Sequence, residues 1–340
     1  MTSAPVTVVI PTYNRRDIVR DAIDSVLGQT RLPAQILIVD DGSKDDTAES
    51  VSSYGDAVQY CYQSNAGLSA ARNHGIWAAT QPFVAFLDDD DVWHPRKIEL
   101  QMRCFELEPA IGLLAAEQFD WPASEFPTVG ENVDRYLRSV TWEQLVVRTL
   151  IPISSVVVRR ELFERTGVFD VAMRSSEDRD LFLRAAELTR LGLLAMPLSG
   201  YRDTPGSMCK NPSGREEAMR QILRRLDERG VWNRRWLLRR KSYSFMHHCC
   251  SDAHARFGNH ARAVVRTIKS LGYYPLPYSA DEVRMRFERP KRLAVNLLRL
   301  AGLKKSDRDT SPRQLPATNA LSRSRQGPAH CCGHGAARAT

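Results

Sequence analysis

The chain has 340 residues, of which 43% are hydrophobic and 26% are charged. These proportions are typical of a soluble globular protein with about two domains. No stretch approaches the roughly 18 uninterrupted apolar residues of a membrane span, which excludes an integral membrane protein. The first residues lack a basic segment followed by a long apolar core, so we expect no signal peptide.

The charge is distributed unevenly along the chain. Residues 1–200 contain 19 Lys and Arg against 29 Asp and Glu, a net charge of −10. Residues 201–340 contain 29 against 11, a net charge of +18, which gives the +8 of the whole chain. Acidic clusters in the first part could bind a divalent cation. The basic region could bind an anionic membrane surface or a nucleic acid, or it could be solvated without a binding partner.

The cysteines indicate a reducing compartment. Seven Cys, with adjacent pairs at Cys249–Cys250 and Cys331–Cys332, do not form the even, spaced pattern of a secreted disulfide framework. The His and Cys residues around both pairs lack the spacing of metal ligands, so we predict no metal site there. We expect a cytoplasmic protein.

Residues 1–115 alternate between two kinds of segment. Apolar runs predict strands, and helical spacing predicts helices between them; the strands are at 6–10, 34–43, 58–63 and 82–87, and the helices at 18–27, 47–54, 68–79 and 95–107. This alternation predicts an α/β fold with a parallel sheet covered on both faces.

The regular alternation ends near residue 116. Further strands are predicted at 111–116, 154–160 and 193–202, with helices at 142–149 and 177–188. From about 215 to 302 the chain reads as helical and basic, and residues 303–340 read as disordered. We therefore divide the chain into four regions: 1–115, 116–210, 211–302 and 303–340.

Polar residues follow the predicted strands. In parallel sheets the ligand crevice lies beyond the carboxyl ends of the strands, where residues 12–14, Asp40–Asp41 and Asp88–Asp91 fall. Four adjacent carboxylates repel one another, and their oxygens suit Mg²⁺ or Mn²⁺ shared with substrate phosphates. The alternative is a solvated loop whose Asp91 caps the next helix. No glycine-rich phosphate-binding loop is present, which favours a metal-held pyrophosphate.

Five segments together resemble one family. Residues 8–15, 38–47, 65–76, 86–101 and 175–184 (VVIPTYNR, IVDDGSKDDT, NAGLSAARNHGI, FLDDDDVWHPRKIELQ and SSEDRDLFLR) are similar, in that order, to family 2 glycosyltransferases of the GT-A fold. The resemblance covers residues 5–210. It implies a Rossmann-like, mainly parallel sheet and inverting transfer of a sugar from a nucleotide-sugar. The nucleotide that it implies is UDP. It also implies an Asp-x-Asp motif with Mn²⁺ or Mg²⁺ and a carboxylate base.

The resemblance assigns roles by position. The donor nucleotide-sugar would lie against Pro11, Thr12, Tyr13, Asp41, Gly67, Arg72, Asn73, Asp88 and Asp89. Asp88 and Asp90 would hold the cation, and Asp178 would be the general base. Glu177, Trp121 and Trp142 are candidates for contact with the acceptor. The structural alternatives are an ion pair for Arg72, core packing for Tyr13 and both Trp residues, and helix capping by Glu177 and Asp178.

Two departures from the family pattern are informative. Relatives often carry a metal-binding His after the last strand, where this chain has Thr204, so Asp203 or water is left to complete the shell. The Gln-x-x-Arg-Trp motif of processive polysaccharide synthases is absent, which favours addition of a single sugar.

The basic region contains two amphipathic stretches. Residues 215–241 hold nine Arg and one Lys with apolar residues at helical spacing, and residues 288–305 form the second stretch. Such helices suit an anionic membrane interface, and many members of the family act on lipid-linked acceptors at the inner leaflet. The alternative is packing on the catalytic domain with a solvated outer face. No nucleic-acid-binding module is recognisable, so we expect no nucleic-acid partner.

The leading interpretation is an inverting, metal-dependent glycosyltransferase for cell-surface polysaccharide or glycolipid, peripheral at the inner face of the cell membrane. A sugar-1-phosphate nucleotidyltransferase would need a basic, glycine-rich loop after the first strand, and VVIPTYNR has none. A non-catalytic nucleotide-sugar-binding protein is the remaining alternative, which only an activity assay separates from an enzyme.

Overall fold

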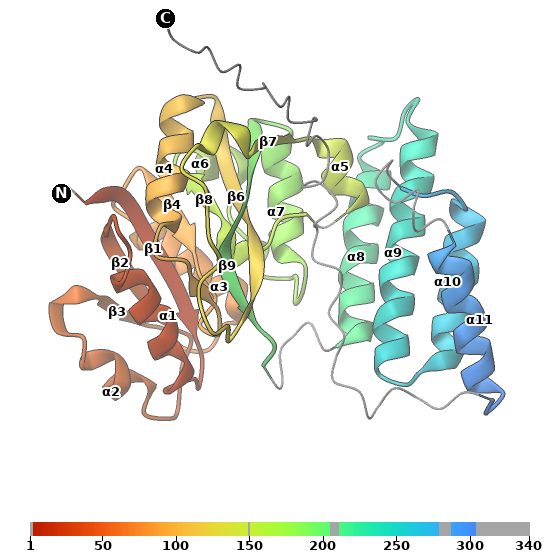
Figure 1. Cartoon of the computed structure of the whole chain (residues 1–340), viewed down its shortest axis with the longest axis horizontal. Coiled ribbons are helices and arrows are strands. Elements are labelled where there is room, and N and C mark those ends of the chain that lie inside the picture. Colours follow the sequence, from red (N-terminus) through yellow and green to blue (C-terminus); the bar gives the residue numbers. More distant parts are fainter. Residues whose placement is uncertain (1–2, 149, 205–210, 279–286, 304–340) are drawn as a thin grey trace, which may run out of the picture.

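The computed structural model describes residues 3–148, 150–204, 211–278 and 287–303 (Figure 1). Its first half alternates strands with helices, as predicted. The strands are β1 (Ala4–Thr12), β2 (Pro33–Asp40), β3 (Gln59–Tyr62) and β4 (Phe83–Phe86), and the helices are α1 (Ile18–Leu27), α2 (Thr47–Ser52), α3 (Leu68–Ala78) and α4 (Lys97–Leu107). The four strands pair in parallel in the order β3-β2-β1-β4. The predicted α/β class is confirmed.

The remaining strands extend the same sheet with mixed pairing. They are β5 (Val92–Trp93), which precedes α4, and β6 (Ile111–Trp121), β7 (Leu137–Val140), β8 (Val157–Arg159) and β9 (Arg190–Arg202). Strand β8 lies antiparallel between β4 and β6, β9 runs parallel to β6, and β5 and β7 pair antiparallel with β9. The strands β5 and β7 were not predicted, because β5 has only two residues and β7 (LRSV) lacks the apolar run that marks the equally short β4 (FVAF).

Both faces of the central strands are buried. Val9 and Val39 belong to one hydrophobic cluster, whereas Val8 and Ile38 belong to another on the opposite face. This division follows from the period of two along a strand. Strand β3 differs from the prediction, since most of its side chains are exposed at the edge of the sheet.

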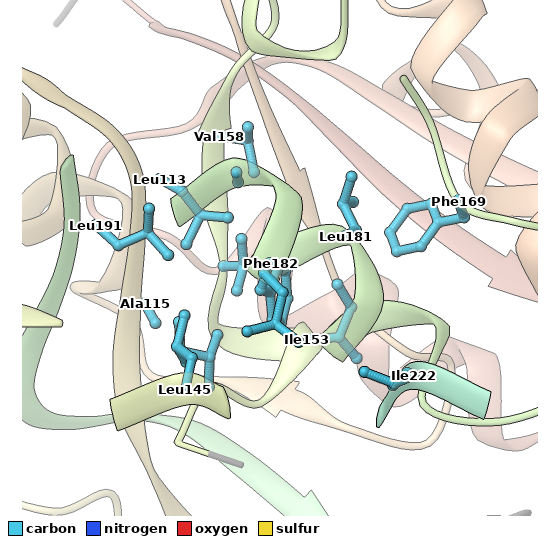
Figure 2. Packing of buried hydrophobic residues seen from close by; sticks show 14 of the residues in the cluster. Leu113, Ala115, Leu145, Ile153, Val158, Phe169, Leu181, Phe182, Leu191 and Ile222 are labelled. Carbon is cyan, nitrogen blue, oxygen red and sulfur yellow. The ribbon is translucent and has the colours of Figure 1, made fainter. Parts of the chain in front are cut away.

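Three shorter helices pack against the sheet; together with the sheet and helices α1 to α4 they form what we call the sheet domain, which ends with strand β9. The three helices are α5 (Trp142–Val147), α6 (Leu162–Thr166) and α7 (Glu177–Ala186), and a 3₁₀ turn covers Ile153–Ser155. Figure 2 shows Leu181 and Phe182 of α7 in the hydrophobic cluster that also contains Leu145 and Ile153. This packing fixes α7 against the sheet.

The basic region is helical, as predicted, and comprises α8 (Pro212–Glu228), α9 (Trp236–Arg256), α10 (His260–Tyr273) and α11 (Glu288–Leu300). Ile222 of α8 lies in the same cluster as α7, so α8 shares the core of the sheet domain (Figure 2). Figure 1 shows α10 and α11 at the end of the molecule away from β3. In the described ranges no helix has the length and apolar character needed to cross a membrane. The disorder predicted for 303–340 and the Cys331–Cys332 pair fall on residues that, apart from Leu303, lie outside those ranges.

Candidate active site at the carboxyl ends of the strands

Each carboxylate of the acidic run, Asp88–Asp91, has a different partner in the protein. Asp88 Oδ1 accepts a hydrogen bond from Arg72 Nη2 (2.5 Å). Asp89 Oδ2 accepts from the Thr12 hydroxyl (2.8 Å), at the end of β1. Burial and the neighbouring charge of Asp90 raise the pKa of Asp89 to about 7. The run is therefore a structured loop, rather than a solvated one.

Asp91 holds the loop to strand β9. Its buried Oδ1 accepts from the Arg202 backbone N–H (3.1 Å), and Arg202 Nε donates to the Asp90 carbonyl oxygen (3.0 Å). Burial raises the pKa of Asp91 well above its usual range. Helix α4 begins only at Lys97, so Asp91 is not its cap. The sequence interpretation missed Arg202, although it directly precedes the segment where a metal ligand was expected.

Thr204 occupies the position where a His was expected, and it lies beside the acidic run. Its hydroxyl donates to Asp90 Oδ2 (2.6 Å). Burial and the charge of Asp88 raise the pKa of Asp90, so a cation bound there would stabilise its ionised carboxylate. Within the described part of the chain, no three His, Cys, Asp or Glu side chains are gathered around one metal position. Asp88, Asp90 and Thr204 supply hard oxygen donors, which fit Mg²⁺ or Mn²⁺ that takes its remaining ligands from phosphates and water.

Arg72 connects the two acidic parts of the site. It is 1% exposed, and its guanidinium also donates from Nη1 to Glu177 Oε1 (2.6 Å) on α7. The guanidinium lies over the Phe169 ring, 5.5 Å from its centre. The structure thus assigns the alternative role, an ion pair, to Arg72. The same pair buries Glu177 to 5% exposure, and its contact with the acceptor stays a prediction.

Asp178 stands in the first turn of α7, beside this ion pair. Ser176 before the helix adopts a left-handed conformation (φ 57°), and Asp178 Oδ1 accepts the N–H of Arg179 (2.7 Å). Burial and the charge of Glu177 raise the pKa of Asp178 to about 6, against an opposing effect of Arg72. A carboxylate of this pKa is ionised at neutral pH and is more basic than an ordinary Asp.

Replacing Glu177 with Gln should move the titration of Asp178 to lower pH. The substitution removes the negative charge of Glu177, which raises the pKa of Asp178. It also removes the ion-pair partner of Arg72, whose positive charge lowers the pKa of Asp178. We expect the acidic limb of the kcat/KM profile to lie near pH 6 in the wild type and below that in Glu177→Gln. Transfer rates measured across pH with one donor and acceptor would check this. A limb that stays in place or moves up would contradict it.

Asp41 and Gly67 contact each other. Asp41 Oδ1 accepts from Gln63 Nε2 and the Ala66 N–H, and its Oδ2 accepts from the Gly67 N–H, each at 2.8 Å. Gly67 has φ 93°, a left-handed value that favours glycine. Asp41 thereby fixes the loop before α3, and its carboxylate oxygens are already engaged.

Asn73 has a different role from the predicted nucleotide contact. Its Nδ2 donates to the Phe169 carbonyl oxygen and its Oδ1 accepts the Phe169 N–H, both at 2.9 Å. The side chain is 2% exposed. Asn73 therefore anchors the segment that leads to α7, and its contact with the donor stays a prediction.

The aromatic candidates divide into exposed and buried side chains. Tyr13 is 42% exposed and follows the buried Pro11, so its ring is open to a ligand at the end of β1. Trp121 is partly exposed and stacks on Phe126, with ring centres 5.5 Å apart. Trp142 is a core residue packed against Trp232, as its structural alternative predicted, and its contact with an acceptor sugar stays a prediction.

Arg225 of α8 fixes the segments on both sides of Asp178. It donates to Asp170 Oδ2 (2.6 Å), in the loop before α7, and to Asp180 Oδ1 (3.3 Å), in the helix itself. No sequence signal distinguishes Arg225 from the other arginines of this helix, so it was not predicted. Its contacts make it a positioning residue for α7.

Replacing Arg225 with Ala should lower kcat about tenfold to a hundredfold, because a small displacement of a reacting group is costly. The affinity for the donor should be unchanged, and Arg225→Lys should restore part of the rate. Arg229→Ala is the matched control, since Arg229 directly follows the same helix and pairs with Glu187, which directly follows α7. Equal losses in the two Ala variants would show that Arg225 serves stability alone.

Known proteins resemble this chain in sequence, chiefly over the part that forms the sheet and the candidate site. The model of glycosyl transferase family 2 matches residues 7–143. An uncharacterised glycosyltransferase of Rickettsia prowazekii is 32% identical over 53% of this chain, and the match spans 58% of that relative's length. TuaG of Bacillus subtilis, whose name assigns it to teichuronic acid biosynthesis, is 31% identical over 61% of this chain and 82% of its own.

The chain belongs to glycosyl transferase family 2. Solved structures agree with the family 2 fold. TarS 1–349 of S. aureus in complex with UDP-GlcNAc superposes with a TM-score of 0.60 and 16% identity, covering 87% of this chain and 92% of TarS 1–349. The mannosyltransferase PcManGT of Pyrobaculum calidifontis, in complex with GDP-Man and Mn²⁺, gives 0.58 and 15%, covering 92% and 89%. The GT-A fold predicted from the family resemblance is confirmed.

Proposed function

We propose that this chain transfers one sugar from a UDP-sugar to a hydroxyl of a saccharide acceptor, with inversion at the anomeric carbon. The observation that carries the proposal is the buried Arg72, which joins Asp88 of the acidic run to Glu177 beside Asp178. This bridge supports the proposal, because it joins the acidic run to the start of α7, where Asp178 lies.

Asp178 is the general base of the proposed reaction. Its Oδ1 accepts a backbone N–H, and among the described residues nothing donates to its Oδ2. Oδ2 takes the proton of the acceptor hydroxyl while that oxygen bonds to the anomeric carbon. The bond from this carbon to the diphosphate breaks, and the nucleoside diphosphate leaves with the electron pair. One carboxylate opposite the leaving group is sufficient for inversion.

The donor nucleotide is held at the ends of β1 and β2. Tyr13 offers an exposed ring for the base, and Asp41 shapes the loop before α3. A divalent cation held by Asp88 and Asp90, with Thr204 beside them, would stabilise the charge of the departing diphosphate. UDP-GlcNAc in TarS supports a UDP-linked donor, and Mn²⁺ in PcManGT supports the cation.

The acceptor approaches from the side of Trp121, the one aromatic acceptor candidate that is partly exposed. A lipid-linked saccharide at the inner face of the cell membrane suits the basic helices of this chain. Synthesis of cell-surface polysaccharide or glycolipid is the corresponding role, and the name of TuaG, a putative teichuronic acid biosynthesis glycosyltransferase, supports it.

Thermal shift and transfer assays test the proposal together. The full chain is screened against UDP-, GDP- and dTDP-sugars with and without Mn²⁺, because a ligand that binds the folded state raises its Tm. We expect UDP-sugars with Mn²⁺ to give the largest shift and to support transfer to saccharide acceptors. Stabilisation without turnover on any acceptor would favour a binding protein, and a preference for GDP-sugars would overturn the donor assignment.

A further inference from the structure

Helix α11 is amphipathic in an unusual sense, with its polar residues facing the protein. The buried residues of this helix are Arg289 and Asn296. Leu297 and Leu298 are 49% and 43% exposed. A surface helix normally buries its apolar stripe, so this arrangement leaves the apolar stripe available for another surface.

The inward face of α11 is held by polar contacts. Arg289 Nη1 donates to the Tyr274 carbonyl oxygen (2.6 Å) and to the Tyr278 hydroxyl (3.0 Å). Arg292 forms an ion pair with Asp252 of α9, and Asn296 Oδ1 lies 3.0 Å from His260 Nδ1 of α10. These contacts fix the rotation of the helix about its axis, so the leucines cannot turn inward without breaking them.

The outward face of α11 forms a continuous apolar stripe. Leu297, Leu298 and Ala301 lie three, four and seven residues after Ala294, which places all four on one side of a helix. All four are exposed, and Lys291 lies one turn before them. The stripe therefore combines leucines with a cation at its edge.

The charges of α10 and α11 select the kind of partner. Helix α10 contains no acidic residue, and the single acid of α11, Glu288, pairs with Arg292. The outer side of α10 exposes Val265 and Ile268 between Arg262 and Lys269. If α10 and α11 paired with the same helices of a second copy of the chain, like charges would come together. An anionic surface would instead neutralise these charges.

We propose that the outer stripe of α11, with the exposed cations of α10, binds the surface of an anionic lipid bilayer. A helix of 13 residues is about 20 Å long, so it would lie in the plane of the interface with its leucines in the acyl region. The inference stands apart from the proposed reaction, because it requires no sugar, nucleotide or metal.

Co-sedimentation of the full chain with vesicles tests the inference. The vesicles contain phosphatidylcholine alone or mixed with phosphatidylglycerol. We expect binding to the mixed vesicles that weakens in high salt, and at least about tenfold weaker binding for the double variant Leu297→Glu, Leu298→Glu. Lys291→Glu should weaken binding to the mixed vesicles alone. The control is Leu32→Glu, Leu107→Glu, in the sheet domain, where the leucines are 47% and 52% exposed; it should bind as the wild type does.

Three results would overturn the inference. The first is wild-type protein that stays in the supernatant with both kinds of vesicle. The second is a double variant that becomes monomeric where the wild type is dimeric, with no vesicle binding by either, which would assign the stripe to a second copy. The third is binding that survives the double variant but is lost when residues 304–340 are removed. Donor-induced Tm shifts, measured on the same samples, report separately on the proposed function.

Discussion

Replacing Asp178 with Asn should lower kcat by about 10²–10⁴-fold, because the acceptor hydroxyl loses its proton acceptor. The affinity for the UDP-sugar should stay close to the wild type, since in the proposed reaction Asp178 contacts the acceptor hydroxyl and not the nucleotide. Steady-state transfer rates and donor titrations would check both values. Glu187→Gln, at the other end of α7, is the control and should keep full activity.

The same variant separates catalysis from helix capping through its stability. The pKa of Asp178 is about 6 in the folded protein against an ordinary value of 3.8. The folded state therefore binds the proton more tightly, and the free energy of unfolding falls as pH rises through this window. Asn cannot ionise, so the substitution removes the cost of burying the charged carboxylate. Asp178→Asn should therefore have a higher Tm than the wild type when both are measured at a pH above 7. An unchanged or lower Tm, with more than about a tenth of the activity retained, would show that Asp178 is only a cap.

Replacing Asp90 with Asn should lower turnover by at least about 10²-fold and should abolish its stimulation by Mn²⁺. Asp90 is the residue of the acidic run that contacts Thr204. Its raised pKa reflects burial and the charge of Asp88. The loss of one negative charge should leave the fold intact. Transfer assays with added Mn²⁺ and with a chelator, together with Tm measurements, would check these expectations.

Asp46→Asn is the matched control for Asp90. Asp46 also follows a strand of the parallel sheet, but its side chain is 65% exposed and pairs with Arg16. It should keep wild-type activity and metal dependence. Full activity of Asp90→Asn in a chelated buffer would contradict the role of this carboxylate and of the cation.

The sequence predicted the parts of the fold that have a clear period. Strand β1 alternates between two cores, and helix α1 buries Val19, Ala22, Ile23 and Val26 at helical spacing, so both elements could be found without a structure. Strand β5 has two residues, Val92 and Trp93, and exists only because it pairs with β9 more than 100 positions later. No local pattern encodes such a pairing.

The site followed the same rule. The family motifs drew attention to Asp90 and to the position of Thr204, which the structure brings into contact, while their role in holding a cation stays a prediction. They could not show that Arg72 pairs with Glu177, 105 positions away, or that Asn73 is bound to the backbone of Phe169. The side-chain partners across the fold decide whether a polar residue faces a ligand or another part of the protein.

Helix α11 shows the limit of amphipathic patterns. The sequence of residues 288–305 predicted an amphipathic helix, and α11 is one. The pattern does not state which face points inward. Here the buried polar contacts of Arg289 and Asn296 determine the orientation, and these depend on α9 and α10.

The anomeric configuration of the product tests the central claim most directly. The wild-type chain is incubated with a UDP-α-sugar, a saccharide acceptor and Mn²⁺, and the new glycosidic bond is assigned by NMR from the coupling constant of its anomeric proton. We predict a β-linked product that forms with the wild type and not with Asp178→Asn. An α-linked product, or a β-linked product formed at an equal rate by Asp178→Asn, would contradict inversion by this base.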